Sequence, residues 1–179
     1  MRILCFGDSN TYGYDPRGFF GGRYGAEDRW VDLLAEKTGW TVINAGVNGR
    51  EIPPRANAPE LSGGYGLVLV MLGTNDLLQG ASEAEAAARM EDFLRQLLPR
   101  HRLLLVSPPP MKRGAWVPTE ELAARSLRLA EEYRLVARRL GIGFVDTRRW
   151  PIGLAFDGVH FTEEGHHAFA EYLQKELGQ

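Results

Sequence analysis

The chain has 179 residues, 44% of them hydrophobic and 25% charged, which is typical of a globular protein with one sizeable core. Its formal net charge of −2 lacks the basic excess that nucleic acids or anionic membranes attract, so neither partner is expected. No apolar run approaches the roughly 20 residues that cross a bilayer, and the N-terminal run is too short for a signal peptide. The only cysteine, Cys5, permits no intrachain disulfide, and together these features predict a cytoplasmic protein.

Short apolar runs alternate with helical patterns along the whole chain. We expect strands at residues 3–6, 41–44, 67–72, 103–106 and 143–145. The third and fourth runs are apolar without alternation, as in strands of a parallel sheet that are buried on both faces. Cys5 lies within the first run and is expected to be a buried, inert side chain.

Four helices are expected between and after these strands. Ser82 and Glu85 form a capping-box pattern that opens one helix, and Thr119 opens a second that ends at Gly141. Residues 30–38 and 163–177 also have helical patterns. This alternation predicts an α/β fold in one domain spanning residues 1–179.

Two long stretches, residues 10–27 and 46–66, show no clear period and are expected to be loops. Both follow predicted strands, so they lie at the carboxyl edge of a parallel sheet, where open α/β folds bind ligands. Their Gly-, Pro- and Tyr-rich composition suits loops that shape a pocket, although plain connections would look the same.

Polar motifs follow four of the predicted elements. They are Gly-Asp-Ser-Asn at 7–10, the glycine-rich segment 44–50, Gly-Thr-Asn-Asp at 73–76 and Asp-Gly-Val-His at 157–160. Because the ends of parallel strands meet at one edge, these segments can converge although they are far apart in sequence.

The four segments supply one candidate for each role in acyl transfer from an ester. Ser9 is the candidate nucleophile, His160 the general base and Asp157 the group that orients the imidazole. The backbone amides of Ser9 and Gly49, with the side-chain amide of Asn75, are candidate donors for an oxyanion hole. Each of Ser9, Gly49 and Asn75 could instead be a residue that merely forms a turn.

In these motifs the chain resembles the GDSL/SGNH hydrolase family at each signature block, from about residue 3 to residue 167. The resemblance implies a three-layer α/β/α sandwich around a five-stranded parallel sheet, a flavodoxin-like SGNH hydrolase fold that needs no cofactor or metal. Asp-Arg-Trp at 28–30 and Val-Ser-Pro-Pro at 106–109 are similar to the short, arylesterase-like branch. Two positions depart from the usual pattern: Asn10 stands where leucine is common, and Arg50 follows Gly49 where Asp-Thr is common.

The resemblance implies a serine esterase that acts on small-molecule esters with short acyl or aryl groups, and oligomers are common in that branch. A carbohydrate acetylesterase, a lysophospholipase or thioesterase, or an acyltransferase would use the same triad. A flavodoxin-like binding module without turnover is the non-enzymatic alternative.

Other polar residues have plainer interpretations. Asp8 and Asp76 are expected to cap or orient loops rather than form a glycosidase-like carboxylate pair. His166 and His167 lie in the predicted last helix without a metal-binding motif, and His101 is expected to be a solvated residue before a strand.

Apolar and aromatic side chains near the predicted rim are candidates for a substrate pocket, or alternatively for core packing. They are Tyr12, Tyr14, Met111, Trp116, Leu154, Phe156 and Phe161.

Overall fold

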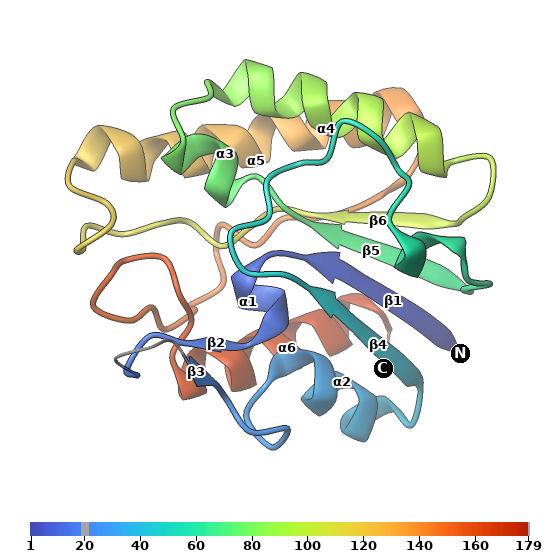
Figure 1. Cartoon of the computed structure of the whole chain (residues 1–179), viewed down its shortest axis with the longest axis horizontal. Coiled ribbons are helices and arrows are strands. Elements are labelled where there is room, and N and C mark those ends of the chain that lie inside the picture. The colour runs from blue at the N-terminus through green and yellow to red at the C-terminus, as the bar shows by residue number, and fades with distance from the viewer. Residues whose placement is uncertain (19–21, 179) are drawn as a thin grey trace.

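A five-stranded parallel sheet lies at the centre of the computed structural model, which describes residues 1–18 and 22–178 (Figure 1). The strand order is β4-β1-β5-β6-β7. The strands are β1 (Arg2–Gly7), β4 (Thr41–Gly46), β5 (Leu67–Met71), β6 (Leu103–Val106) and β7 (Gly143–Val145). All five predicted strands are therefore present, with ends that differ from the predicted ones by two residues at most.

Helices cover both faces of the sheet, which gives the predicted three-layer α/β/α architecture. Helices α4 (Glu83–Leu97) and α5 (Glu120–Leu140) lie above the sheet in Figure 1, and α2 (Trp30–Thr38) and α6 (Glu163–Glu176) lie below it. A hydrophobic core lies on each face of the sheet, and β1 contributes alternate residues to the two cores. Leu4 and Phe6 pack toward α4 and α5, and Ile3 and Cys5 pack toward α2 and α6. Residues Ile3–Phe6 of β1 are all apolar because both faces of the strand are buried there.

The helices begin and end where local chemistry allows. Ser82 and Glu85 form a reciprocal capping box at the start of α4, and the Thr119 side chain caps α5. Helix α5 ends at Gly141, which has a φ of 65°. The side chain of Thr162 accepts a hydrogen bond from the amide of Gly165 and caps α6.

The connections between the strands also hold short elements that the sequence did not reveal. They are α1 (Ser9–Tyr12), the antiparallel pair β2 (Tyr14–Asp15) and β3 (Gly22–Arg23), the 3₁₀ turn η1 (Pro59–Ser62) and α3 (Thr74–Leu78). Elements of two to five residues are too short to show a hydrophobic period. The expectation of plain loops over residues 10–27 and 46–66 was therefore only partly right, and residues 19–21 lie outside the described part.

The burial of two side chains bears on the sequence predictions. Cys5 is fully buried in β1, and burial raises the pKa of its thiol, as expected of an inert cysteine. His101 was expected to be solvated but is buried, and its Nε2 lies 2.9 Å from the carbonyl oxygen of Leu61.

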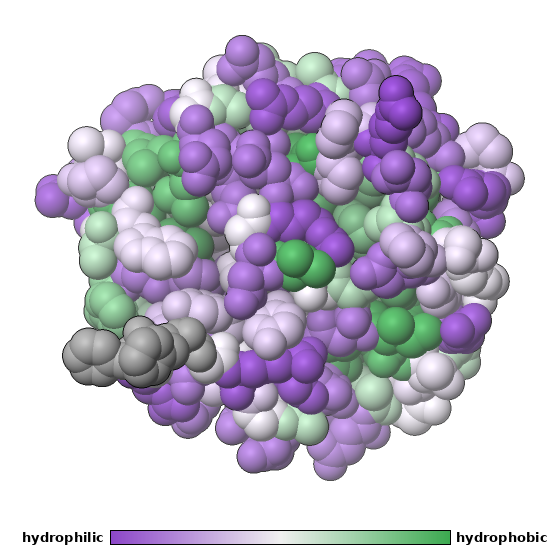
Figure 2. All heavy atoms as spheres, in the orientation of Figure 1, coloured by the Kyte–Doolittle hydropathy of each residue, from purple (hydrophilic) through white to green (hydrophobic). Residues whose placement is uncertain are grey.

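The outer surface is mostly hydrophilic on the face that Figure 2 shows, and its apolar areas are small and separate. No helix within residues 1–18 and 22–178 is long and apolar enough to cross a membrane.

Candidate active site

Helix α1 presents Ser9 directly after the end of β1. The side chain of Asp8 caps this helix by accepting a hydrogen bond from the amide of Asn10 at 3.0 Å. A side chain at Gly7 would collide with Thr11, and one at Gly46 would collide with the backbone of α1. The two glycines therefore let α1 fold back closely against the ends of β1 and β4.

His160 lies between Ser9 and Asp157. Its Nε2 is 2.9 Å from Ser9 Oγ, and its Nδ1 is 2.6 Å from Asp157 Oδ2. The other oxygen, Asp157 Oδ1, accepts hydrogen bonds from the amides of Val159 and His160 at 2.8 and 2.9 Å. The structure thus brings together three residues separated by up to 151 positions, in the order carboxylate, imidazole and hydroxyl.

The surroundings of Asp157 favour its charged form. Burial opposes ionisation, but hydrogen bonds from the His160 ring and from the amides of His160 and Val159 outweigh it and lower the pKa of Asp157. An ionised Asp157 accepts a hydrogen bond from the N–H at Nδ1 of His160, which leaves Nε2 able to accept a proton from Ser9.

Gly49 and Asn75, the other two candidate oxyanion donors, belong to neighbouring segments. Gly49 occupies a turn with a φ of 71°, and Asn75 lies in the first turn of α3. The Asn75 Nδ2 group donates to the carbonyl oxygen of Arg50 at 3.1 Å, which joins α3 to this turn. Within the described residues, the amides of Ser9 and Gly49 donate no hydrogen bond, so both are available to a ligand.

Asp76 strengthens the link between α3 and the segment after β4. Its buried carboxylate accepts a hydrogen bond from the amide of Ile52 at 3.1 Å and pairs with Arg89 at 3.2 Å. Asp8 and Asp76 thus cap a helix and orient a loop, as predicted.

Arg50, whose role the sequence left open, ties the ends of two strands together. Its guanidinium donates to the carbonyl oxygens of Gly7 and Ala45 and lies 4.0 Å from the centre of the Phe6 ring. Arg50 also lies near the buried Asp8. Burial raises the pKa of Asp8 to about 6, and the Asn10 hydrogen bond and the charges of His160 and Arg50 limit that rise.

Two aromatic rings flank the imidazole of His160. The Tyr14 ring is 4.6 Å from it, and the Trp116 ring meets it edge-on at 4.9 Å. Trp116 is 50% exposed and is held by a hydrogen bond from its amide to the carbonyl oxygen of Asp157. These two rings form an aromatic surface beside the reacting groups.

The other predicted pocket residues have varied environments. Phe156 is 69% exposed and borders a hollow of about 270 Å³. Tyr12 is partly buried, and the guanidinium of Arg23 lies over its ring. The backbone of Leu154 forms an isolated antiparallel β-bridge with that of Phe161.

Met111 and Phe161 are buried in the two hydrophobic cores. The prediction that these two residues line the pocket is therefore wrong, because core packing leaves them almost no surface for a substrate.

The two histidines of α6, His166 and His167, have partners outside the triad. His166 Nδ1 faces the amide of Trp30 at 3.5 Å, and His167 pairs with Asp28 at 3.0 Å. In the described part of the chain, no three His, Cys, Asp or Glu side chains are grouped to hold a metal ion.

Known proteins resemble this chain in sequence and in fold. The sequence profile of the GDSL-like lipase/acylhydrolase family matches residues 5–168. No match was found among curated protein sequences.

Several solved structures share the fold over nearly the whole chain. An aryl esterase from M. smegmatis is 26% identical, with a TM-score of 0.85 over 99% of this chain and 98% of that one. A carbohydrate acetylesterase family member from Sinorhizobium meliloti is 28% identical, with a TM-score of 0.84 over 99% of this chain and 97% of that one. Est24, a carbohydrate acetylesterase from the same organism, is 23% identical with a TM-score of 0.85 over 99% of both chains, and supports the fold. The protein is therefore a carboxylic ester hydrolase and belongs to the GDSL-like lipase/acylhydrolase family.

Proposed function

We propose that this esterase hydrolyses short-chain acyl or aryl esters through an acyl-enzyme intermediate on Ser9. The observation that carries the proposal is the unbroken line of hydrogen bonds from Asp157 through His160 to Ser9. This is the arrangement that a hydroxyl nucleophile, its base and the group orienting that base require.

In the first half-reaction, Ser9 Oγ attacks the acyl carbon while His160 Nε2 takes the hydroxyl proton. The carbonyl electron pair moves onto oxygen, which accepts hydrogen bonds from the amides of Ser9 and Gly49 and from the Asn75 side chain. When the carbonyl re-forms, the bond to the alcohol breaks, and His160 returns its proton to the departing oxygen. Asp157 stays ionised and stabilises the transient imidazolium, in keeping with its lowered pKa.

In the second half-reaction, water attacks the acyl group on Ser9. His160 takes a proton from this water, the ester bond to Ser9 breaks, and the serine hydroxyl recovers its proton as the carboxylic acid leaves. An alcohol in place of water gives a new ester, so acyl transfer uses the same steps. Product analysis in water–alcohol mixtures measures how the acyl group is divided between the two acceptors.

Two observations favour small esters with a flat leaving group. The Trp116 and Tyr14 rings beside His160 offer an aromatic surface to such a group. The similar structures include one described as an aryl esterase. Others are described as carbohydrate acetylesterases, and aromatic rings also stack against sugars, so acetylated sugars are the second candidate.

A substrate panel tests the proposal. It contains p-nitrophenyl esters of increasing chain length, phenyl acetate, acetylated sugars, a lysophospholipid and acyl thioesters, each assayed with wild-type protein and with Ser9→Ala. We expect the highest kcat/KM with short aryl esters and a loss of at least about a thousandfold in Ser9→Ala. Wild-type rates in a folded Ser9→Ala protein would rule out the nucleophile, whereas faster turnover of acetylated sugars would redirect the substrate assignment.

A cytoplasmic location, a homo-oligomeric state and the absence of nucleic-acid partners remain predictions. Cell fractionation, light scattering and an electrophoretic mobility assay, respectively, would test them.

A further inference from the structure

Asn10, the residue after the proposed nucleophile, bonds to the main chain on both sides of His160. Its Nδ2 donates to the carbonyl oxygen of Val159 at 3.0 Å, and its Oδ1 accepts from the amide of Phe161 at 3.0 Å. The side chain is 5% exposed. The side-chain amide of Asn10 therefore makes one hydrogen bond as a donor and one as an acceptor with the main chain on the two sides of the proposed general base.

The other main-chain bonds of this segment come from elsewhere. The amide of His160 donates to Asp157, and its carbonyl oxygen accepts from the amide of Ala155 at 2.7 Å. The carbonyl oxygen of Phe161 accepts from the Tyr24 hydroxyl at 3.3 Å. Of these contacts, only those of Asn10 join the His160 segment to the helix that carries Ser9.

Asn10 is itself held in place. The indole of the fully buried Trp30 donates from Nε1 to the carbonyl oxygen of Asn10 at 2.9 Å, and the Asp8 carboxylate accepts from the Asn10 amide. The main chain of Asn10 is thus fixed by a buried indole and by the carboxylate that caps α1.

We propose that Asn10 is a positioning residue: by binding Val159 and Phe161 it holds His160 Nε2 at reacting distance from Ser9 Oγ. The proposal rests on the proposed function of Ser9 and His160. Asn10 follows Ser9 in the chain, and its side-chain amide binds the two neighbours of His160. One residue therefore fixes the position of the base relative to the nucleophile.

The expected effect falls on the chemical step. Misplacing reacting groups by about 1 Å can cost about a hundredfold in rate, so Asn10→Leu should lower kcat by about 10- to 100-fold. KM should stay within about twofold, because the Asn10 side chain is buried and its polar atoms are bonded to Val159 and Phe161. The rate of Ser9 modification by a fluorophosphonate should fall in parallel with kcat.

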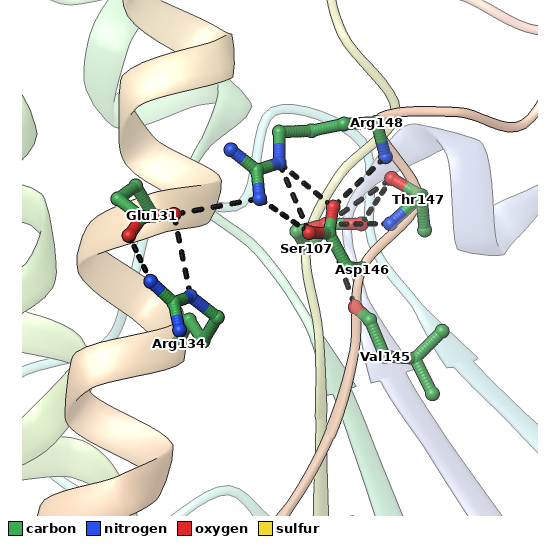
Figure 3. A network of polar contacts seen from close by, with 7 residues as sticks. All are labelled: Ser107, Glu131, Arg134, Val145, Asp146, Thr147 and Arg148. Carbon is green, nitrogen blue, oxygen red and sulfur yellow. Dashed lines mark hydrogen bonds and ion pairs between the residues drawn. The ribbon is translucent and has the colours of Figure 1, made fainter.

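Thr147→Val is the matched control. Thr147 Oγ1 lies in a buried polar contact beyond β6 and β7, where it donates to the carbonyl oxygen of Ser107 at 2.9 Å and lies 3.2 Å from Ser107 Oγ (Figure 3). The control therefore also loses two buried hydrogen bonds of one side chain, but none that involves the triad. It should lower Tm while kcat remains that of the wild type.

Asn10→Asp provides a second readout in case leucine prevents folding. A protonated carboxyl can donate to Val159 and accept from Phe161 as the amide does, whereas a carboxylate cannot donate. The ratio of variant to wild-type kcat, taken at each pH, should therefore rise as the pH falls.

The outcomes separate the proposals. A kcat loss in Asn10→Leu with unchanged KM and an unaffected Thr147→Val supports positioning. Wild-type kcat in folded Asn10→Leu overturns it, as do equal kcat losses in Asn10→Leu and Thr147→Val. If leucine prevents folding, a ratio for Asn10→Asp that rises as the pH falls supports positioning, and a flat ratio overturns it. An active Ser9→Ala would instead overturn the proposed function, whatever the Asn10 variants show.

Discussion

Asp8 caps α1, the helix that carries Ser9, and only 2% of this residue is exposed. Burial raises the pKa of Asp8 from 3.8 to about 6, despite the opposing hydrogen bond from Asn10 and the charges of His160 and Arg50. The folded protein therefore holds this proton more tightly than the unfolded chain does. As the pH rises from 3.8 to 6, the unfolded chain ionises freely while the folded state must ionise a buried group, so stability is lost.

Asp8→Asn should remove this loss of stability with rising pH, because an asparagine side chain does not ionise. The asparagine oxygen can still accept the hydrogen bond from the amide of Asn10, so the cap on α1 is retained. A shift of about 2 pKa units corresponds to about 3 kcal/mol of unfolding free energy once the pH exceeds 6. Because the group is buried, solvent screening does not reduce this value appreciably.

Urea unfolding of wild-type protein and Asp8→Asn between pH 4 and pH 7.5 measures the effect. The unfolding free energy of the variant minus that of the wild type should rise by about 2 kcal/mol across this range. A difference that does not change with pH would refute the reasoning, because it would mean that folding does not perturb the Asp8 carboxyl.

Three further variants have defined outcomes. Burial lowers the pKa of His166 to about 3, so the contribution of this residue to stability falls by about 1.4 kcal/mol per pH unit as the pH drops below 6.5. His166→Phe should remove this slope and gain about 2 kcal/mol on the wild type between pH 7 and pH 5; urea unfolding with equal slopes would contradict it. Asn75→Ala should lower kcat for p-nitrophenyl acetate by about 100- to 1,000-fold, and a wild-type kcat would exclude Asn75 from the oxyanion hole. Asp157→Asn should lower kcat by about 10,000-fold with an unchanged circular dichroism spectrum, and normal kinetics would mean that another group orients His160.

The sheet and its main helices could be predicted because their signals are local. The apolar run 67–72 identifies a strand with two buried faces, and the Ser82 capping box marks a helix start in the sequence itself. The convergence of Ser9, Asp157 and His160 could be predicted too, since Ser9 follows a strand of the parallel sheet and the other two lie just before the last helix.

The rest of the site depends on contacts between distant residues, which leave no local signal. Asn10 was recognised only as a departure from a common motif, because its partners Val159 and Phe161 lie about 150 positions away. The buried state of His101 depends on the carbonyl oxygen of Leu61, 40 positions earlier in the chain. Phe161 adjoins His160 in sequence, yet it packs into the core.

Labelling with a fluorophosphonate, followed by peptide mapping, tests the central claim most directly. We predict one phosphonyl group per chain, attached to Ser9 Oγ, with labelling abolished in Ser9→Ala and slowed by orders of magnitude in His160→Ala. Attachment to a different residue, or ester turnover by a folded wild-type enzyme that the reagent neither labels nor inhibits, would contradict a nucleophilic Ser9 activated by His160.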